Sequence, residues 1–306
     1  MLNSFRSEKG AVMVIAALMM VTLLSIAAIA LDVGHLYVVK AKLQSAADAA
    51  ALAGATTLMD SHDVAIADSQ GAVYVAHNLS GTYQYSSQSI IPTSTFTVSL
   101  SQDVNFYFAP IMGIKSSSVR ATATASANTI IALSNVVPFA VVQQQFKYGQ
   151  QYILKYAAGG GQGGNYGPVA LGGNVASTYR DNIMYGYQGQ IRIDDVLTTK
   201  PGNMAGPTDQ GVSYRKSLCT NGCSYQTQIE ANCPRVVIAP VIDSLEGNGR
   251  TTVTVVGFAA FFLEDTQVST SKGQKDIVGR FLKWSAIGET GNAANSFGLI
   301  HATLNK

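Results

Sequence analysis

Three cysteines lie close together and are the side chains best suited to covalent or metal chemistry. Cys219, Cys223 and Cys233 fall within 15 residues. A structural zinc site needs a fourth ligand, and the histidines are remote from this segment in sequence (His35, His62, His77 and His301). In an oxidising compartment we expect one disulfide and one remaining thiol. A bridge from Cys233 to either Cys219 or Cys223 is favoured, because it closes a longer loop than Cys219–Cys223 would.

Adjacent acidic residues occur at Asp194-Asp195 and Glu264-Asp265. Neighbouring residues of a strand point to opposite faces, so neither pair brings two carboxylates together for acid–base catalysis. The sequence has no H-E-x-x-H motif. We therefore predict no catalytic, cofactor-binding or metal-binding residue and do not expect an enzyme.

Two segments rich in glycine and proline are candidate contact loops. Gly159–Gly167 contains a G-x-G-x-x-G pattern, but it runs into Asn165-Tyr166-Gly167-Pro168, which cannot open the helix that a dinucleotide site needs. In Lys200–Thr208, the pairs Pro201-Gly202 and Gly206-Pro207 predict tight turns. The residues predicted to contact a partner are Asn165, Tyr166, Pro201, Gly202, Asn203 and Pro207.

The charge of the chain argues against a nucleic-acid partner. The net charge is only +2, without a basic cluster, and 12% of the residues are charged. Few lysines and many Ser, Thr, Asn, Gln and Gly residues are typical of exported β-rich domains. No small-molecule substrate is indicated.

An apolar run determines where the rest of the chain must lie. From Ala11 to Leu31, 21 consecutive residues carry no charge, between a basic leader (Arg6, Lys9) and Asp32. As a helix this run spans about 30 Å, the hydrocarbon thickness of a bilayer. We predict a single transmembrane anchor. A cleaved signal peptide is the alternative, with Ala28-Ile29-Ala30 as its cleavage site, although the run is longer than an ordinary signal-peptide core.

The helix is expected to continue beyond the membrane. Apolar or small residues follow an i, i+3, i+4, i+7 stripe, and alanine is abundant up to Leu58 (the stripe is Leu36, Val39, Leu43, Ala46, Ala47, Ala50 and Ala53). A second helix is predicted over 60–78, with Asp60 or Ser61 as its N-cap.

Alternating apolar residues predict strands after these helices. A strand pair is expected over 95–108, and further strands over 118–127, 151–156, 236–242, 251–263 and 297–304. Thr251–Leu263 is apolar but too short for a membrane span, so we predict a buried central strand. The predicted fold class is α+β, with a transmembrane helix extending into a pilin-like helix-plus-antiparallel-sheet module. The expected parts are a leader and anchor (1–34), that module (35–134) and a mostly β domain (135–306).

Several of these residues form a pattern that resembles TadE/TadG-like proteins of Flp (Tad) pilus assembly. The resemblance rests on Glu8-Lys9-Gly10 before the apolar run, Leu31-Asp32-Val33-Gly34-His35 after it, and LQSAADAAALAGA over 43–55. Its motif residues are Gly10, Asp32, Gly34, Leu43, Gln44, Ala47, Asp48, Ala51 and Gly54. The resemblance is strong over about residues 6–60 and weaker beyond.

This resemblance implies an inner-membrane protein with a cytoplasmic N-terminus and a periplasmic body that serves a pilus or secretion machine. Prepilins cleaved after a glycine carry a glutamate five residues later, whereas Ile15 stands at that distance from Gly10. The TadG-like type, an unprocessed structural accessory, is therefore expected. A secreted β-rich adhesin or binding protein with a cleaved signal peptide is the alternative.

Overall fold

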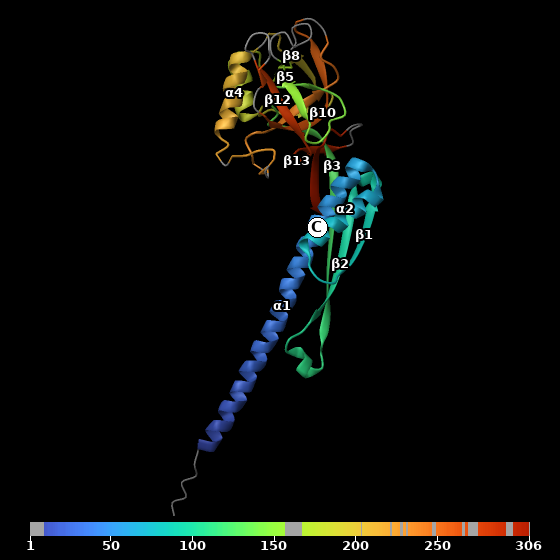
Figure 1. Cartoon of the computed structure of the whole chain (residues 1–306), viewed down its shortest axis with the longest axis vertical. Helices are drawn as coiled ribbons and strands as arrows, with labels where there is room; N and C mark the ends of the chain where they lie inside the picture. The colour runs from blue at the N-terminus through green and yellow to red at the C-terminus, as the bar shows by residue number, and fades with distance from the viewer. Residues whose placement is uncertain are drawn as a thin grey trace, which may run out of the picture. The chain divides into compact units, whose positions relative to one another are not determined.

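A computed structural model describes residues 9–156, 167–202, 204–220, 222–226, 229–230, 232–246, 249–264, 267–268, 275–291 and 296–305 (Figure 1). The chain divides into two compact units, Met1–Ser126 with Thr303–Lys306, and Ala127–Ala302. This division falls inside one strand, β3 (Ser116–Leu133). The three-part scheme expected from the sequence stays a prediction.

The first unit is built on α1 (Lys9–Ser61), the continuous helix that the sequence predicts. From Val12 to Leu31 the side chains are exposed, except for the half-buried Ala28, and among the described residues α1 alone is long and apolar enough to cross a membrane. From Leu43 onward the same helix buries its alanine-rich stripe (Leu43, Ala46, Ala47, Ala50, Ala51, Ala55 and Leu58). One helix thus has an uncovered half and a half that belongs to a protein core.

The second helix, α2 (Val64–Asn78), starts later than expected. Asp63 is its N-cap and accepts hydrogen bonds from the N–H groups of Ala65 (2.8 Å) and Ile66 (3.2 Å). The predicted caps, Asp60 and Ser61, are instead the last residues of α1. The break falls at His62, which has a left-handed φ of 52° that ends the first helix.

An antiparallel sheet of β1 (Gln84–Ile90), β2 (Thr95–Asn105) and β3 completes this unit beside α1 and α2 (Figure 1). Alternation on β2 buries Phe96, Val98 and Leu100, as predicted, against the helices. β1 was not predicted, because its run of serine and glutamine lacks an apolar alternation. A short 3-10 helix, η1 (Ile91–Thr93), connects β1 to β2.

The strand pair expected over 95–108 is wrong, because a single strand, β2, occupies this segment. β2 ends at Asn105, and Phe106 to Lys115 form a loop that contains the short 3-10 helix η2 (Ala109–Met112). Pro110 cannot donate a ladder hydrogen bond, which favours this turn over a continued strand. Figure 1 shows this hairpin running alongside α1 toward its N-terminal half.

The second unit is mostly β, as predicted, around β10 (Thr252–Leu263). β10 pairs with β9 (Val236–Ile242), β12 (Lys275–Leu282) and β8 (Val196–Thr199), and β12 also pairs with β5 (Gln151–Lys155). Its residues Phe258 to Leu263 are buried, which confirms a central strand rather than a membrane span. The remaining strands are β4 (Val141–Val142), β6 (Val169–Ala170), β7 (Ile191–Arg192), β11 (Gln267–Val268), β13 (Trp284–Ser285), β14 (Glu289–Gly291) and β15 (Leu299–Asn305), of which β15 ends within the first unit.

Two helices in this unit were not predicted, α3 (Ala176–Tyr185) and α4 (Ala205–Ser217). Tyr179, Ile183 and Val212 bury side chains from them in the core. Gly206-Pro207, expected to be a tight turn, lies in the first turn of α4. Proline is tolerated there because its missing N–H has no partner inside the helix.

Candidate functional site

Asp32, the first residue after the apolar run, binds the loop between β2 and β3. Its Oδ1 accepts a hydrogen bond from the Tyr107 N–H (2.8 Å), and its Oδ2 accepts bonds from Phe108 (3.1 Å) and Ala109 (2.8 Å). The carboxylate therefore caps the N–H groups at the start of η2 and just before it. It fixes the hairpin to α1 across more than 70 residues of sequence.

The surroundings of Asp32 favour its ionised form. Burial raises the pKa of its carboxyl, but the hydrogen bonds from Tyr107, Ala109 and Phe108 outweigh that effect and leave the pKa below its usual value. His35, one turn later on α1, meets the edge of the Tyr107 ring at a centroid distance of 5.1 Å. Two residues of the same α1 segment thus contact the loop.

An apolar groove of about 290 Å³ lies between α1 and this loop. From α1 it is lined by Ser25, Ala28, Ile29, Asp32, Val33 and Leu36, and from the hairpin by Phe106, Phe108, Ala109, Ile111, Met112 and Ile114. Three of the α1 residues belong to the predicted membrane span. The groove therefore continues the apolar surface of the anchor onto the hairpin.

Other motif residues of α1 hold the sheet against the helix by packing and by hydrogen bonds. Leu43, Ala47 and Ala51 are completely buried. Gln44 donates its side-chain amide to Asp48 Oδ1 (2.8 Å) and to the Thr122 carbonyl of β3 (3.1 Å). Lys40 Nζ also donates to a β3 carbonyl, that of Arg120.

Two motif glycines differ in their surroundings. At Gly54 an added Cβ would lie 2.2 Å from Cδ1 of Phe96, so only glycine fits there. At Gly34 an added Cβ would meet nothing within 4 Å. Gly10 lies in the first turns of α1, and the surroundings of residues 1–11 are outside the described part.

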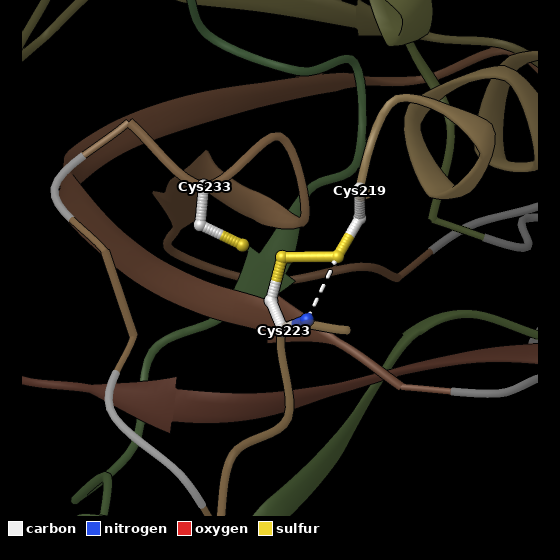
Figure 2. Close-up of side chains that lie close together, drawn as sticks. All are labelled: Cys219, Cys223 and Cys233. Carbon is white, nitrogen blue, oxygen red and sulfur yellow. Dashed lines mark hydrogen bonds between the residues drawn. A yellow bond between two sulfur atoms is a disulfide. The ribbon is translucent and has the colours of Figure 1, made fainter. Parts of the chain in front are cut away.

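The three cysteines meet in the second unit, with their Sγ atoms within 4.8 Å of one another (Figure 2). Cys219 and Cys223 form the disulfide, and Cys233 is a buried thiol. The preference for a bridge to Cys233 is therefore wrong in this structure. Loop length in the unfolded chain does not fix pairing, because the folded chain brings Cys219 and Cys223 together across a short turn while holding Cys233 in the core beside β9.

The acidic pairs serve local structure where they are described. Asp195 accepts a hydrogen bond from the Arg192 N–H (2.7 Å), which closes a turn, and Asp194 has a left-handed φ of 72°. Glu264 forms an ion pair with Arg280 (2.6 Å). Asp265 lies outside the described residues.

The predicted contact loops are described only in part. Pro201 and Gly202 are exposed, and Pro207 lies in α4. Asn165, Tyr166 and Asn203 lie outside the described residues, as does most of Gly159–Gly167. Lys200, at the start of this loop, is buried and donates to the Asn174 carbonyl (2.7 Å), so it holds the loop to the fold.

Lys155 on β5 is a buried base that sequence reasoning missed. Its side chain is 1% exposed and donates to the Tyr156 carbonyl (3.0 Å). Burial lowers its pKa to about 8, although the nearby charge of Asp276 opposes the shift. A lysine at the end of an otherwise alternating strand gives no sequence signal of burial.

Sequence reasoning also missed the loop bound by Asp32, because it assigned Tyr107 and Phe108 to a strand. The available signal was the string Phe106–Ile114, which has no charged residue although it connects two strands. Connecting loops are ordinarily polar.

Comparison with known proteins gives a match for the N-terminal segment only. Residues 10–57 match the family model described as putative Flp pilus-assembly TadE/G-like. The resemblance predicted from the sequence is confirmed for that segment. No curated protein and no solved structure matches the chain. The match covers the apolar run, Asp32 and the buried stripe of α1 as far as Ala55.

Proposed function

We propose that this chain is an inner-membrane-anchored accessory of a Tad-type pilus assembly machine or a related secretion system, with a structural rather than catalytic role. The apolar half of α1 spans the bilayer and its second half carries the pilin-like module outside it. The observation that carries this proposal is the division of one helix at Asp32. Its apolar residues before Asp32 are largely exposed, and within the family match after Asp32 the alanine-rich stripe from Leu43 to Ala55 is buried.

An extracytoplasmic body with a cytoplasmic N-terminus is supported by three features. The leader carries Arg6 and Lys9, which favours retention of that flank in the cytoplasm, although Lys40 and Lys42 on the other flank weaken the bias. The composition is typical of exported domains. The Cys219–Cys223 disulfide is of a kind that persists in oxidising compartments.

Contacts with other machine components are proposed at two places. Small residues of the anchor, such as Ala16, Ala17 and Ala27, permit close approach of partner helices. In the body, the proposed contact lies at Pro201 and Gly202, which are exposed, whereas Pro207 is part of α4. Genes for a secretion ATPase and a small Flp-like prepilin beside this one would support the assignment.

Reporter fusions test the orientation. A periplasm-active reporter and a cytoplasm-active reporter are each fused after residue 128, and we expect activity from the former alone. Activity only from the cytoplasmic reporter would overturn the topology. Carbonate extraction of the untagged protein should leave it in the membrane fraction.

The intact mass of the membrane-extracted protein separates the proposal from its alternatives. We expect an N-terminus that precedes Gly10, because Ile15 replaces the acid that prepilin processing requires. A chain starting at Ala11 would make the protein a processed pseudopilin. A chain starting at Leu31 would favour a secreted binding protein, whose cleavage would also remove the groove residues Ser25, Ala28 and Ile29.

A further inference from the structure

The loop Phe106–Ile114, here called the hairpin tip, has an apolar surface with no cover in the described structure. We propose that the hairpin tip inserts into the membrane beside α1 and that lipid acyl chains fill the groove and cover the tip. This inference rests on the proposed function, because it requires α1 to remain as a membrane anchor. It adds a second membrane contact to a protein predicted to have one.

The exposed side chains of the hairpin tip are large and apolar. Ile111 is 88% exposed, Met112 76% and Tyr107 68%. Soluble proteins rarely expose a contiguous apolar patch of this kind without a binding role. Contact with acyl chains would remove these apolar side chains from water, which is energetically favourable.

The position of the tip along α1 places it at membrane depth. Its groove includes Ser25, Ala28 and Ile29, which precede Asp32 by three to seven residues within the apolar run. At 1.5 Å per residue these positions lie about 4–10 Å below Asp32 along the helix axis. If the apolar run spans the hydrocarbon core, the residues that meet it across the groove lie below the membrane surface.

The backbone of the tip suits an environment without water. The N–H groups of Tyr107, Phe108 and Ala109 are bonded to Asp32. Other N–H groups bond to carbonyls within or beside the tip: Phe106 to Lys115, Ile111 to Phe108, Gly113 to Pro110, and Ile114 to Ala109. Pro110 has no N–H. These bonds lower the cost of removing this part of the backbone from water, because a buried N–H group without a partner is costly.

Charged residues mark the limits of the apolar segment. Asp103 precedes the tip and Lys115 follows it, and both are exposed. Lysine and tyrosine are favoured at the membrane–water interface, where a long or aromatic side chain keeps its polar end in water. Lys115 and Tyr107 are placed to do this at the base of the tip.

Lipid is a better occupant than a partner helix for two reasons. The groove joins the exposed face of the tip to the exposed side chains of Ile29 and Val33 of α1, next to an anchor surface that acyl chains must cover in any case. Helix partners in membranes pack on small residues, whereas the tip presents isoleucine, methionine and aromatic side chains.

Depth-dependent fluorescence quenching tests the proposal in the full-length protein. Single tryptophans are introduced as Ile111→Trp, Leu24→Trp and Gln88→Trp, each in phosphatidylethanolamine–phosphatidylglycerol nanodiscs with or without bromine on the acyl chains. The native Trp284 gives a constant background that the unsubstituted protein measures. Leu24 is an exposed residue of the anchor, and Gln88 is an exposed residue of β1.

We expect brominated lipid to quench most of the added emission of Ile111→Trp and Leu24→Trp and none of that of Gln88→Trp. Quenching of Leu24→Trp with an Ile111→Trp that responds to aqueous acrylamide instead would overturn the inference and leave the anchor standing. Protection of Ile111→Trp from both quenchers would also overturn it, in favour of a protein partner or a second copy. An unquenched Leu24→Trp would remove the anchor, and the proposed function with it. Met112→Trp repeats the measurement at the neighbouring exposed position.

Discussion

Gly54 of α1 packs directly against the ring of Phe96 from β2. A Cβ added at Gly54 would lie 2.2 Å from the ring carbon Cδ1. Gly71 of α2 approaches the same ring, with 3.1 Å between its added Cβ and Cε1. The Phe96 side chain is completely buried. Two helices thus pack onto the sheet through one aromatic ring, which a glycine from each helix accommodates.

Gly54→Ala should destabilise the first unit by about 1–3 kcal/mol, because the ring cannot move out of a filled core. Thermal unfolding of the full-length protein in detergent, followed by circular dichroism, measures the loss. Gly34→Ala is the matched control, since an added Cβ meets nothing there and alanine favours the helix. Adding Phe96→Leu to Gly54→Ala should restore part of the stability, and a double variant no better than the single one would contradict a steric cause.

Asp32→Asn should release the hairpin tip from α1. An amide has one acceptor oxygen where the carboxylate has two, so the N–H groups of Phe108 and Ala109 would face an NH₂ donor or lose a partner. Hydrogen exchange at Tyr107 to Ala109, measured by mass spectrometry, should accelerate.

The control for that exchange experiment is Asp103→Asn, which changes an exposed acid close to the same loop. Exchange at Tyr107 to Ala109 should stay as in the unsubstituted protein. Equal acceleration in both variants would show that general charge, and not the Asp32 hydrogen bonds, protects the loop.

The stability of the second unit should rise with pH between about 8 and 10.5 because of Lys155. The folded pKa of this lysine is lowered to about 8 from an ordinary value of 10.5, so the unfolded state binds more protons in that interval. The gain is fully present above 10.5 and is lost as the pH falls through 8. Fluorescence of Trp284, which lies in this unit, follows its unfolding.

Lys155→Met is the matched variant, because it keeps the length of the side chain without a titrating group. It should be more stable than the unsubstituted protein at pH 7, with the difference shrinking as the pH approaches 10.5. A difference that does not vary with pH would refute a buried lysine as the cause.

Sequential labelling should find Cys233 as the free thiol and Cys219–Cys223 as the bridge. The protein is alkylated without reductant, first folded and then denatured, and is afterwards reduced and alkylated with a second reagent. Because Cys233 is buried, we expect it to take the first reagent only after denaturation. Mass spectrometry should locate the second reagent at Cys219 and Cys223, and its presence on Cys233 would contradict the pairing.

Local composition and periodicity were sufficient for the parts of the fold that depend on neighbouring residues. The charge-free run to Leu31 and the alanine-rich stripe to Leu58 predicted α1, because helical spacing places these side chains on one face whatever they later contact. The alternation at Phe96, Val98 and Leu100 predicted β2 for the same reason. The hydrophobic run of Thr251–Leu263 predicted the buried strand β10.

The tertiary structure alone decided the contacts between residues that are distant in sequence. Asp32 meets Tyr107 only because β2 and β3 fold back along α1, and no local pattern encodes that approach. Folding likewise paired Cys219 with Cys223, since the position of each Sγ atom depends on the core around Cys233 rather than on loop length. The sequence by itself determined which faces of the helices and strands must be buried, because the apolar side chains on those faces favour removal from water. Only the tertiary structure decided which residue packs on each buried face. Many residues of similar chemistry could do so, and the folded path of the chain brings one of them into contact.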